Sequence, residues 1–208
     1  MPRRPEWIIG GFYHVFNRGA NRQTIFFDRD NYLHFLKLIR RHLFDQETDG
    51  LPSASDELRV ESDALRPIDI AAYCLMPNHF HLLVRLNRDD LSERMKSLAQ
   101  AYVEAVNRRF ERSGPLFEGR FRAILVDDEA YLWQLSRYIH LNPVEAGLVA
   151  RASDWEYSSY PEYVGERIGT LPHPALVLKD FGETPRYRRF VEGQAIGGPD
   201  LRPLLFDE

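Results

Sequence analysis

Cysteine is almost missing from this chain of 208 residues, and so are long apolar stretches. The single cysteine, Cys74, excludes an intramolecular disulfide and any cysteine-rich zinc site, which is typical of a reducing compartment. No apolar run approaches the roughly eighteen residues that a membrane-spanning helix needs. The N-terminal residues MPRRPEW lack the apolar core of a signal peptide, and no glycine-rich phosphate-binding loop is present. We therefore expect a cytoplasmic protein without a nucleotide cofactor.

An excess of positive charge is also missing, because the net charge is −4. The distribution of charge is uneven, however. Residues 45–63 hold seven acidic residues and one arginine, so the remainder of the chain carries +2. Residues 1–44 have eight Lys or Arg against three acids, and residues 94–122 have seven against three. Two basic blocks of this kind could form a positive groove for nucleic acid, although solvated helix faces would have the same composition.

The order of periodic segments predicts an α+β fold. Apolar alternation or short apolar runs indicate strands, and apolar residues three or four apart indicate helices. The order β-α-β-β-α-β-α matches a ferredoxin-like split βαβ arrangement, an antiparallel sheet with helices on one face. The predicted strands are residues 11–18, 68–76, 79–86 and 121–126, and the predicted helices are 28–43, 90–110 and 128–142.

Composition divides the chain into a main domain and an extension. We expect one domain over residues 1–165, interrupted at 45–67 by an acidic insert whose Ser, Asp, Glu and Gly content predicts a flexible loop. Residues 166–208 are richer in Pro and Gly, and two short helices are expected near 173–180 and 184–193. We interpret this part as a C-terminal extension rather than as an independent domain.

Two histidines occupy alternate positions on the third predicted strand. His79 and His81 flank Phe80, and side chains two residues apart on a strand point to the same face. Their imidazoles, with backbones about 7 Å apart, could chelate one metal ion. A His-x-His pair alone is a weak signal, because a surface pair without a ligand has the same spacing.

The last predicted helix carries a tyrosine and an amide one turn apart. Tyr131, Leu135, Tyr138 and Asn142 are spaced by four, three and four residues, so they share one stripe. A tyrosine hydroxyl can attack a phosphodiester and conserve the bond energy as a phosphotyrosine. The oxygen of Asn142 could join two histidines around a metal. Taken alone, such a pair is more often a core tyrosine and a capping asparagine.

Two further residues compete for roles at this site. Tyr102 is the alternative nucleophile, but it lies between Leu98 and Val106 on the apolar stripe of its helix, which predicts a core position. His14 lies on the first strand, which in a ferredoxin-like sheet is next to the strand of His79. His14 could face the site, but a packed or hydrogen-bonded histidine is the favoured interpretation.

Arginines alternate with aromatic residues near the end of the long helix and at the fourth strand. This combination suits single-stranded DNA, which offers phosphates for charge and bases for stacking. Each arginine taken singly is equally typical of an ordinary surface. The candidate DNA-binding residues are Arg108, Arg109, Arg112, Arg120 and Arg122, together with Arg18 on the first strand.

Five segments together resemble the REP-associated tyrosine transposases. These belong to a wider class of single-strand transposases with a His-hydrophobic-His (HUH) motif. The resemblance covers about residues 8–165, and PNHFHLLV with YIHLNPVEAGLV is its most specific part. The segments are YHVFNRGANRQTIFFDRDNY, YCLMPNHFHLLVRL, SGPLFEGRFRAILV, YIHLNPVEAGLV and DWEYSSYPEY.

The resemblance implies a ferredoxin-like fold with a site for a divalent metal, Mg²⁺ or Mn²⁺. It assigns the metal histidines to His79 and His81 and the nucleophile to Tyr138. It also implies Asn142 as a third ligand, at a position where related insertion-element enzymes have glutamine. The shorter asparagine side chain makes this ligand less secure than the histidines.

The implied activity is cleavage and rejoining of single-stranded DNA through a covalent 5′-phosphotyrosine, at hairpin-forming repeats. The expected partner is single-stranded or hairpin DNA, close to the nucleoid, with a homodimer left open. Two other interpretations remain at this point. One is a DNA- or RNA-binding regulator that keeps the fold without the chemistry. The other is a zinc-dependent hydrolase, which would leave Tyr138 without a role.

Overall fold

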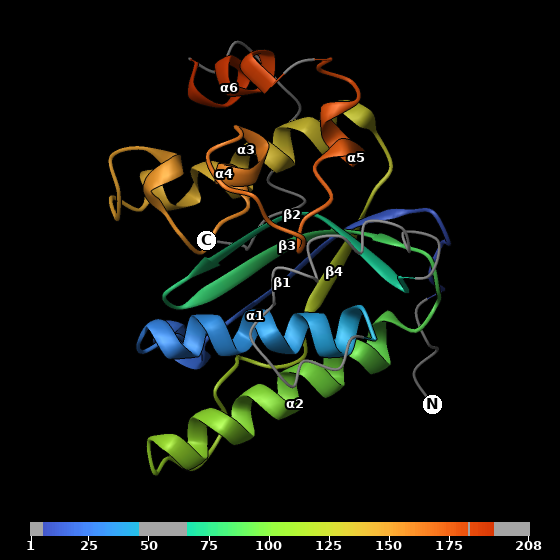
Figure 1. Ribbon diagram of the computed structural model, residues 1–208. Helices are drawn as coiled ribbons and strands as arrows, with labels where there is room; N and C mark the ends of the chain where they lie inside the picture. The colour runs from blue at the N-terminus through green and yellow to red at the C-terminus, as the bar shows by residue number, and fades with distance from the viewer. Residues whose placement is uncertain (1–5, 46–65, 183, 194–208) are drawn as a thin grey trace.

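The computed structural model describes residues 6–45, 66–182 and 184–193 (Figure 1). The acidic insert expected at 45–67 therefore lies almost wholly outside the described residues, as does the end of the chain after residue 193. The main elements follow the predicted order closely. They are β1 (Phe12–Arg18), α1 (Arg29–Leu43), β2 (Ile68–Met76), β3 (His79–Leu86), α2 (Leu91–Arg109), β4 (Arg122–Val126) and α3 (Glu129–Glu145).

The four strands form one antiparallel sheet in the order β2-β3-β1-β4. The first and third strands are its centre, and the β1–β3 register pairs Phe16 with His81 and Arg18 with His79. Two β-α-β units interleaved in this way give the split βαβ topology. The predicted α+β, ferredoxin-like fold class is therefore confirmed.

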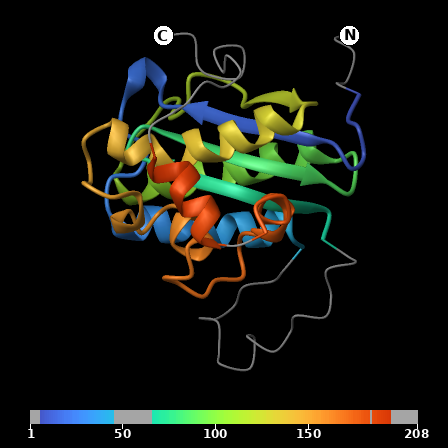
Figure 2. The ribbon, with the colours of Figure 1, turned by 90° about the horizontal axis from the view of Figure 1, so that it is seen from above.

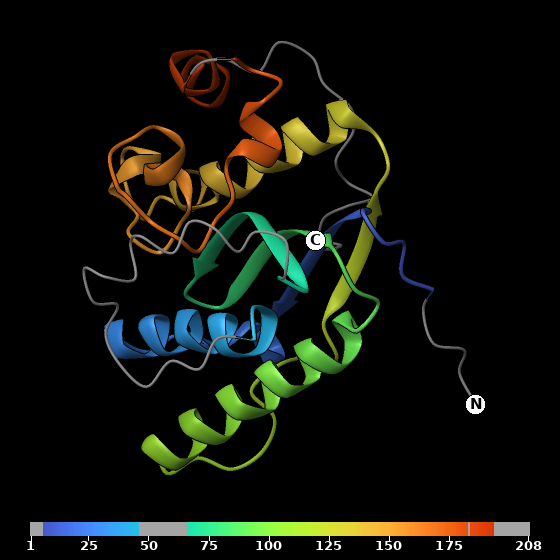
Figure 3. The ribbon, with the colours of Figure 1, turned by 45° about the vertical axis from the view of Figure 1, so that its right-hand side comes forward.

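Helices cover both faces of the sheet, whereas the sequence predicted helices on one face only. Figure 1 shows α1 and α2 below the sheet and α3 above it, and Figure 3 shows the same two layers from another side. The reason is that β2 and β3 are apolar on both faces. Leu82 and Phe80 point into the cluster with α1 and α2, whereas Leu83 and Cys74 point into the cluster with α3. We call these the α1/α2 face and the α3 face.

Local signals explain where the helices begin. The Asp28 side chain accepts a hydrogen bond from the Asn31 backbone N–H at 3.0 Å, and Asp128 does the same for Tyr131 at 3.1 Å. Both are side-chain N-caps, which satisfy backbone donors that a first helical turn leaves open.

The end of α3 differs from the prediction. The sequence placed it at Asn142, before Pro143, but the helix continues to Glu145. Pro143 lacks the N–H that would bond one turn back, but its carbonyl remains available. The Leu148 N–H donates to that carbonyl at 2.9 Å, and the Ala146 N–H donates to the Asn142 carbonyl at 3.0 Å. These bonds close the last turn.

Short elements follow α3 and pack on its outer side. They are the 3-10 turn η4 (Ala152–Asp154) and the helices α4 (Tyr160–Tyr163), α5 (Ala175–Leu178) and α6 (Thr184–Glu192). The last two correspond to the two short helices expected in the extension. Seen from above, α6 lies over α3 (Figure 2). The domain boundary expected at residue 165 stays a prediction.

A buried polar network joins α3 to these later elements. The Tyr187 hydroxyl donates to Ser136 Oγ at 3.0 Å and lies 2.8 Å from His140 Nδ1, while His140 Nε2 lies 2.8 Å from Ser159 Oγ. All four residues are fully buried. A satisfied polar network of this kind fixes the orientation of the helix that carries it, because any rotation would leave buried groups unpaired.

Candidate functional site

Strand β3 presents two histidines side by side on the α3 face. The rings of His79 and His81 are 4.9 Å apart between centroids and nearly perpendicular, at 80°. Phe80 between them points into the opposite core, against Phe35. The period-2 geometry expected from the sequence is therefore present, and His81 is fully buried.

Helix α3 lies over this pair and brings its own pair of residues to it. The Tyr138 ring meets the His81 ring edge-on, with centroids 5.4 Å apart at 79°. Asn142 Oδ1 lies 3.2 Å from His79 Nε2. Tyr138 and Asn142, one helical turn apart on α3, thus face His81 and His79 on β3. All four predicted site residues meet in one place.

A strained turn holds Asn78, the residue whose side chain contacts His79. Asn21 and Arg22 both adopt left-handed backbone conformations, with φ of 54° and 59°. Non-glycine residues occupy this region at a cost of about 1–3 kcal/mol each, which the surrounding structure must compensate. This backbone conformation places the Arg22 carbonyl where it accepts a hydrogen bond from Asn78 Nδ2 at 3.2 Å.

That hydrogen bond determines the tautomer of His79. Since Nδ2 of Asn78 donates to Arg22, its Oδ1 faces His79 Nδ1 at 2.7 Å, and an amide oxygen only accepts. The proton of the neutral imidazole therefore sits on Nδ1, and Nε2 presents a lone pair toward Asn142. Outer partners that fix a histidine in this manner are usual behind metal ligands.

His14 supports the second histidine. It is fully buried on β1, and its Nε2 lies 2.9 Å from His81 Nδ1. His14 is therefore hydrogen-bonded, as the sequence favoured, and because its partner is His81 it also faces the site. The contact engages Nδ1 of His81 and directs its Nε2 away from His14.

Burial keeps both β3 histidines neutral. It lowers the pKa of His79 to about 4; the Asn142 oxygen, which would accept a hydrogen bond from the protonated ring, opposes the shift, and the charge of Arg18 assists it. Burial also holds the pKa of His81 well below its ordinary value, helped by the neighbouring His79 and His14. Neutral imidazoles are the form that binds metals.

The donor set fits a divalent metal ion. His79 Nε2 and Asn142 Oδ1 are two acceptors 3.2 Å apart, close to the roughly 3 Å between adjacent ligands of an ion bound at about 2.1 Å. In residues 6–45, 66–182 and 184–193, no group of three or more His, Cys, Asp or Glu could hold a metal. Asn142 contributes an amide oxygen beside the two imidazoles.

Tyr102 belongs to the core, as its position on the apolar stripe predicts. It is fully buried, and its hydroxyl donates to the Ile25 carbonyl at 2.7 Å. Burial raises its pKa strongly. A hydroxyl that is inaccessible and already bonded is a poor nucleophile, so the rival assignment loses its support.

The six candidate arginines fall into two groups. Arg109 binds Asp28 and Asp30 at 2.8 and 3.1 Å, Arg112 binds Gln23, and Arg18 binds Glu118 at 2.8 Å. These three hold neighbouring elements together. The other three, Arg108, Arg120 and Arg122, are exposed. The role of all six arginines in DNA binding stays a prediction.

Sequence patterns missed Asn78 and Arg22. Asn78 directly precedes the histidine pair, which is the only local hint of its role. The contribution of Arg22 is a main-chain carbonyl in an unusual backbone conformation, and no side-chain pattern indicates that.

Comparison with known proteins supports the same family as the motifs. A family model described as "Transposase IS200 like" matches residues 40–142, which contain both histidines, Tyr138 and Asn142. The chain is therefore similar to the IS200-like transposase family over about half of its length. The resemblance seen in the sequence motifs is therefore confirmed.

Two relatives carry the REP-associated tyrosine transposase name. A Haemophilus influenzae protein is 31% identical over 113 residues, covering 49% of this chain and 64% of the relative. An Escherichia coli K12 protein is 27% identical over 105 residues, covering 50% and 59%. The chain thus matches less than two thirds of the length of either relative.

A solved structure shares the fold. It is a REP-associated tyrosine transposase bound to a REP hairpin, with a TM-score of 0.57 and 19% identity, and the match covers 83% of this chain and 94% of that one.

In the part of the chain that the structure describes, no helix is both long and apolar enough to cross a membrane.

Proposed function

We propose that this protein is a transposase that cleaves and rejoins single-stranded DNA through a covalent bond to Tyr138. The observation that carries the proposal is the meeting of two pairs, Tyr138 with His81 and Asn142 with His79. This arrangement packs the half-buried Tyr138 against one neutral imidazole of a set of metal donors.

The site residues have separate roles in this proposal. His79, His81 and Asn142 would hold Mg²⁺ or Mn²⁺, an ion that polarises the scissile phosphate and so compensates for the weak acidity of a tyrosine. Asn78 and His14 keep the two imidazoles in the orientation that ligation needs. The buried network around His140 and Tyr187 holds α3, so Tyr138 keeps its position during attack.

The chemical step conserves the phosphodiester energy. The Tyr138 oxygen forms a bond to phosphorus as the bond from phosphorus to O3′ breaks. The hydroxyl proton is released and the leaving O3′ gains one, so one strand ends in a free 3′-OH. The other strand stays on the enzyme by its 5′-phosphate. A 3′-OH from another strand reverses the step and rejoins the DNA.

We propose hairpin-forming single-stranded DNA as the substrate, at the nucleoid. The support is the family, together with the related fold whose structure was determined with a REP hairpin. Exposed Arg108, Arg120 and Arg122 offer charge for phosphates.

The test uses two labels on one DNA. The protein is incubated with Mn²⁺ and hairpin-bearing single strands labelled at either the 5′ or the 3′ end, then run on a denaturing gel. A 5′-phosphotyrosine retains the 3′-labelled piece on the protein and releases the 5′-labelled piece. Binding with no adduct under either label would favour the non-catalytic regulator, and hydrolysis without an adduct would favour a metal hydrolase.

A further inference from the structure

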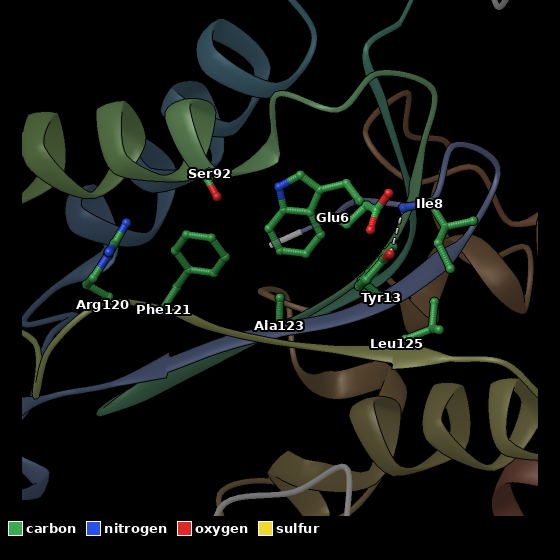
Figure 4. A pocket seen from close by; sticks show the side chains of 9 residues that line it. Glu6, Ile8, Tyr13, Ser92, Arg120, Phe121, Ala123 and Leu125 are labelled. Carbon is green, nitrogen blue, oxygen red and sulfur yellow. Dashed lines mark hydrogen bonds between the residues drawn. The ribbon is translucent and has the colours of Figure 1, made fainter. Parts of the chain in front are cut away.

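A pocket lies at the open edge of the sheet, on the face away from the histidines. It has a volume of about 560 Å³ between β4 and the start of α2. Ala123 and Leu125 of β4 and Phe121, the residue just before β4, point into it, and Ser92 points toward it from α2 (Figure 4). Since β4 is the last strand of the sheet, the pocket can be reached from the edge.

Aromatic side chains on neighbouring segments keep this pocket in shape. Trp7 lines it and packs edge-on against Tyr13, with ring centroids 5.1 Å apart at 82°. The Tyr13 hydroxyl accepts a hydrogen bond from the Ile8 N–H at 2.9 Å, which holds the segment carrying Trp7 in place. Ala123 lies between Phe121 and Leu125, and its small side chain leaves space in the pocket.

The pocket also has a charged residue at each end. Arg120 is exposed and forms no salt bridge with any other described residue. Glu6 lies at the opposite end of the pocket from Arg120 (Figure 4). A mostly apolar pocket with aromatic walls and a cation at one end can hold a nucleobase, whose ring stacks on an aromatic side chain while its phosphate stays outside.

Strand β4 connects this pocket to the candidate active site. Residues alternate across the strand, so Phe121 faces the pocket and Arg122 faces the α3 side. Arg122 pairs with Phe16 on β1, and Phe16 pairs with His81 on β3. The backbone of Arg122 is therefore two strand spacings, about 10 Å, from that of His81. A DNA strand that crosses the β4 edge beside Arg120 and Arg122 would reach both places.

We infer that the pocket of Trp7 and Phe121 binds one unpaired base of the single-stranded DNA, with Arg120 on the adjacent phosphate. The inference rests on the proposed function, since it concerns the same substrate. It adds a subsite that holds the strand at a fixed distance from Tyr138. It also gives a role to the alternation of arginine and phenylalanine in residues 120–122.

Photocrosslinking locates the base directly. Single-stranded DNA that carries 5-iododeoxyuridine at one position per oligonucleotide is irradiated with the full-length protein, and the attached peptide is identified by mass spectrometry. We expect one position in the DNA to attach to the peptide containing Trp7 or Phe121. Crosslinks confined to other peptides overturn the inference.

Affinity measurements supply a second readout. Phe121→Leu and Trp7→Leu keep an apolar side chain but remove the stacking ring, so DNA affinity should fall about five- to tenfold. Phe190→Leu, a half-buried residue of α6, is the matched control and should stay within twofold. Mn²⁺ affinity and melting temperature should be retained in all three. If a pocket variant does not fold, the crosslinking map of the unsubstituted protein decides whether the pocket binds a base.

The two proposals fail in different ways. Normal DNA binding and a normal Tyr138 adduct, with no crosslink in the pocket, overturn the base subsite alone. A pocket crosslink without any adduct supports the subsite and contradicts the catalytic proposal. A protein that binds no single-stranded DNA overturns both.

Discussion

His79 Nε2 and Asn142 Oδ1 face each other at 3.2 Å as two acceptors. Asn78 fixes the His79 proton on the opposite nitrogen, so no hydrogen of that ring lies between them. Two lone pairs at this distance repel unless a cation lies between them. This contact joins strand β3 to helix α3 and gives the predictions below their starting point.

Tyr138→Phe should abolish the covalent adduct and leave hairpin binding unchanged. The substitution removes one oxygen and keeps the ring against His81, so stability should change by less than about 0.5 kcal/mol. A denaturing gel and fluorescence anisotropy measure the two effects.

Tyr102→Phe is the matched control for that substitution. It leaves the buried Ile25 carbonyl without its donor and should cost about 1–2 kcal/mol of stability, but activity should remain. An inactive Tyr102→Phe beside an active Tyr138→Phe would place the nucleophile on α2.

His79→Ala or His81→Ala should remove Mn²⁺ binding, measured by titration calorimetry, and with it DNA cleavage. EDTA should have the same effect on the unsubstituted protein, because each change removes the ion or one of its neutral imidazole ligands. His42→Ala, outside the site, is the control and should bind Mn²⁺ normally. Full cleavage in EDTA would contradict the metal-dependent mechanism.

Asn78→Ala should weaken Mn²⁺ binding about 10- to 100-fold, since the His79 tautomer is no longer enforced. Asn78→Asp keeps an acceptor for His79 Nδ1–H and should retain affinity to within a few-fold. Calorimetry on both variants tests this without any DNA. Equal affinities for Asn78→Ala and the unsubstituted protein would show that Asn78 does not position His79.

Arg108→Glu combined with Arg120→Glu should lower single-strand affinity and flatten its salt dependence. Each lost phosphate contact reduces the slope of log K against log salt by about 0.7. Arg41→Glu makes the same charge change at an exposed position of α1 and is the control for each of the two single substitutions. Arg109 is unsuitable for this test because its reversal would add a third acid beside Asp28 and Asp30. An unchanged slope would place the DNA elsewhere.

Stability should fall as the pH drops below about 6.5. Burial lowers the pKa of His140 to about 3, so between pH 4 and 6 the unfolded chain binds a proton that the folded chain does not. Each such histidine lowers the free energy of unfolding by about 1.4 kcal/mol per pH unit on acidification. His79 and His81 contribute with the same sign.

His140→Gln isolates one of these contributions. Denaturant unfolding at several pH values should give a slope smaller by about 1.4 kcal/mol per pH unit than in the unsubstituted protein, whatever the loss of absolute stability. An unchanged slope would mean that His140 is protonated in the folded state.

Much of this protein can be predicted from local patterns in its sequence. Alternation places His79 and His81 on one face, helical spacing places Tyr138 one turn from Asn142, and the apolar stripe buries Tyr102. These predictions succeed because strand and helix periods are properties of a few consecutive residues.

Long-range packing determines the rest. Both faces of β2 and β3 are apolar, so no periodicity indicates that α3 covers the face opposite to α1 and α2. That choice brings Tyr138 to His81 across 57 positions of sequence and allows Asn142 to meet His79. Likewise, the His79 tautomer depends on a carbonyl of Arg22 that only a left-handed turn presents to Asn78. Contacts between distant segments depend on how whole surfaces fit together, and local periodicity carries no information about that fit.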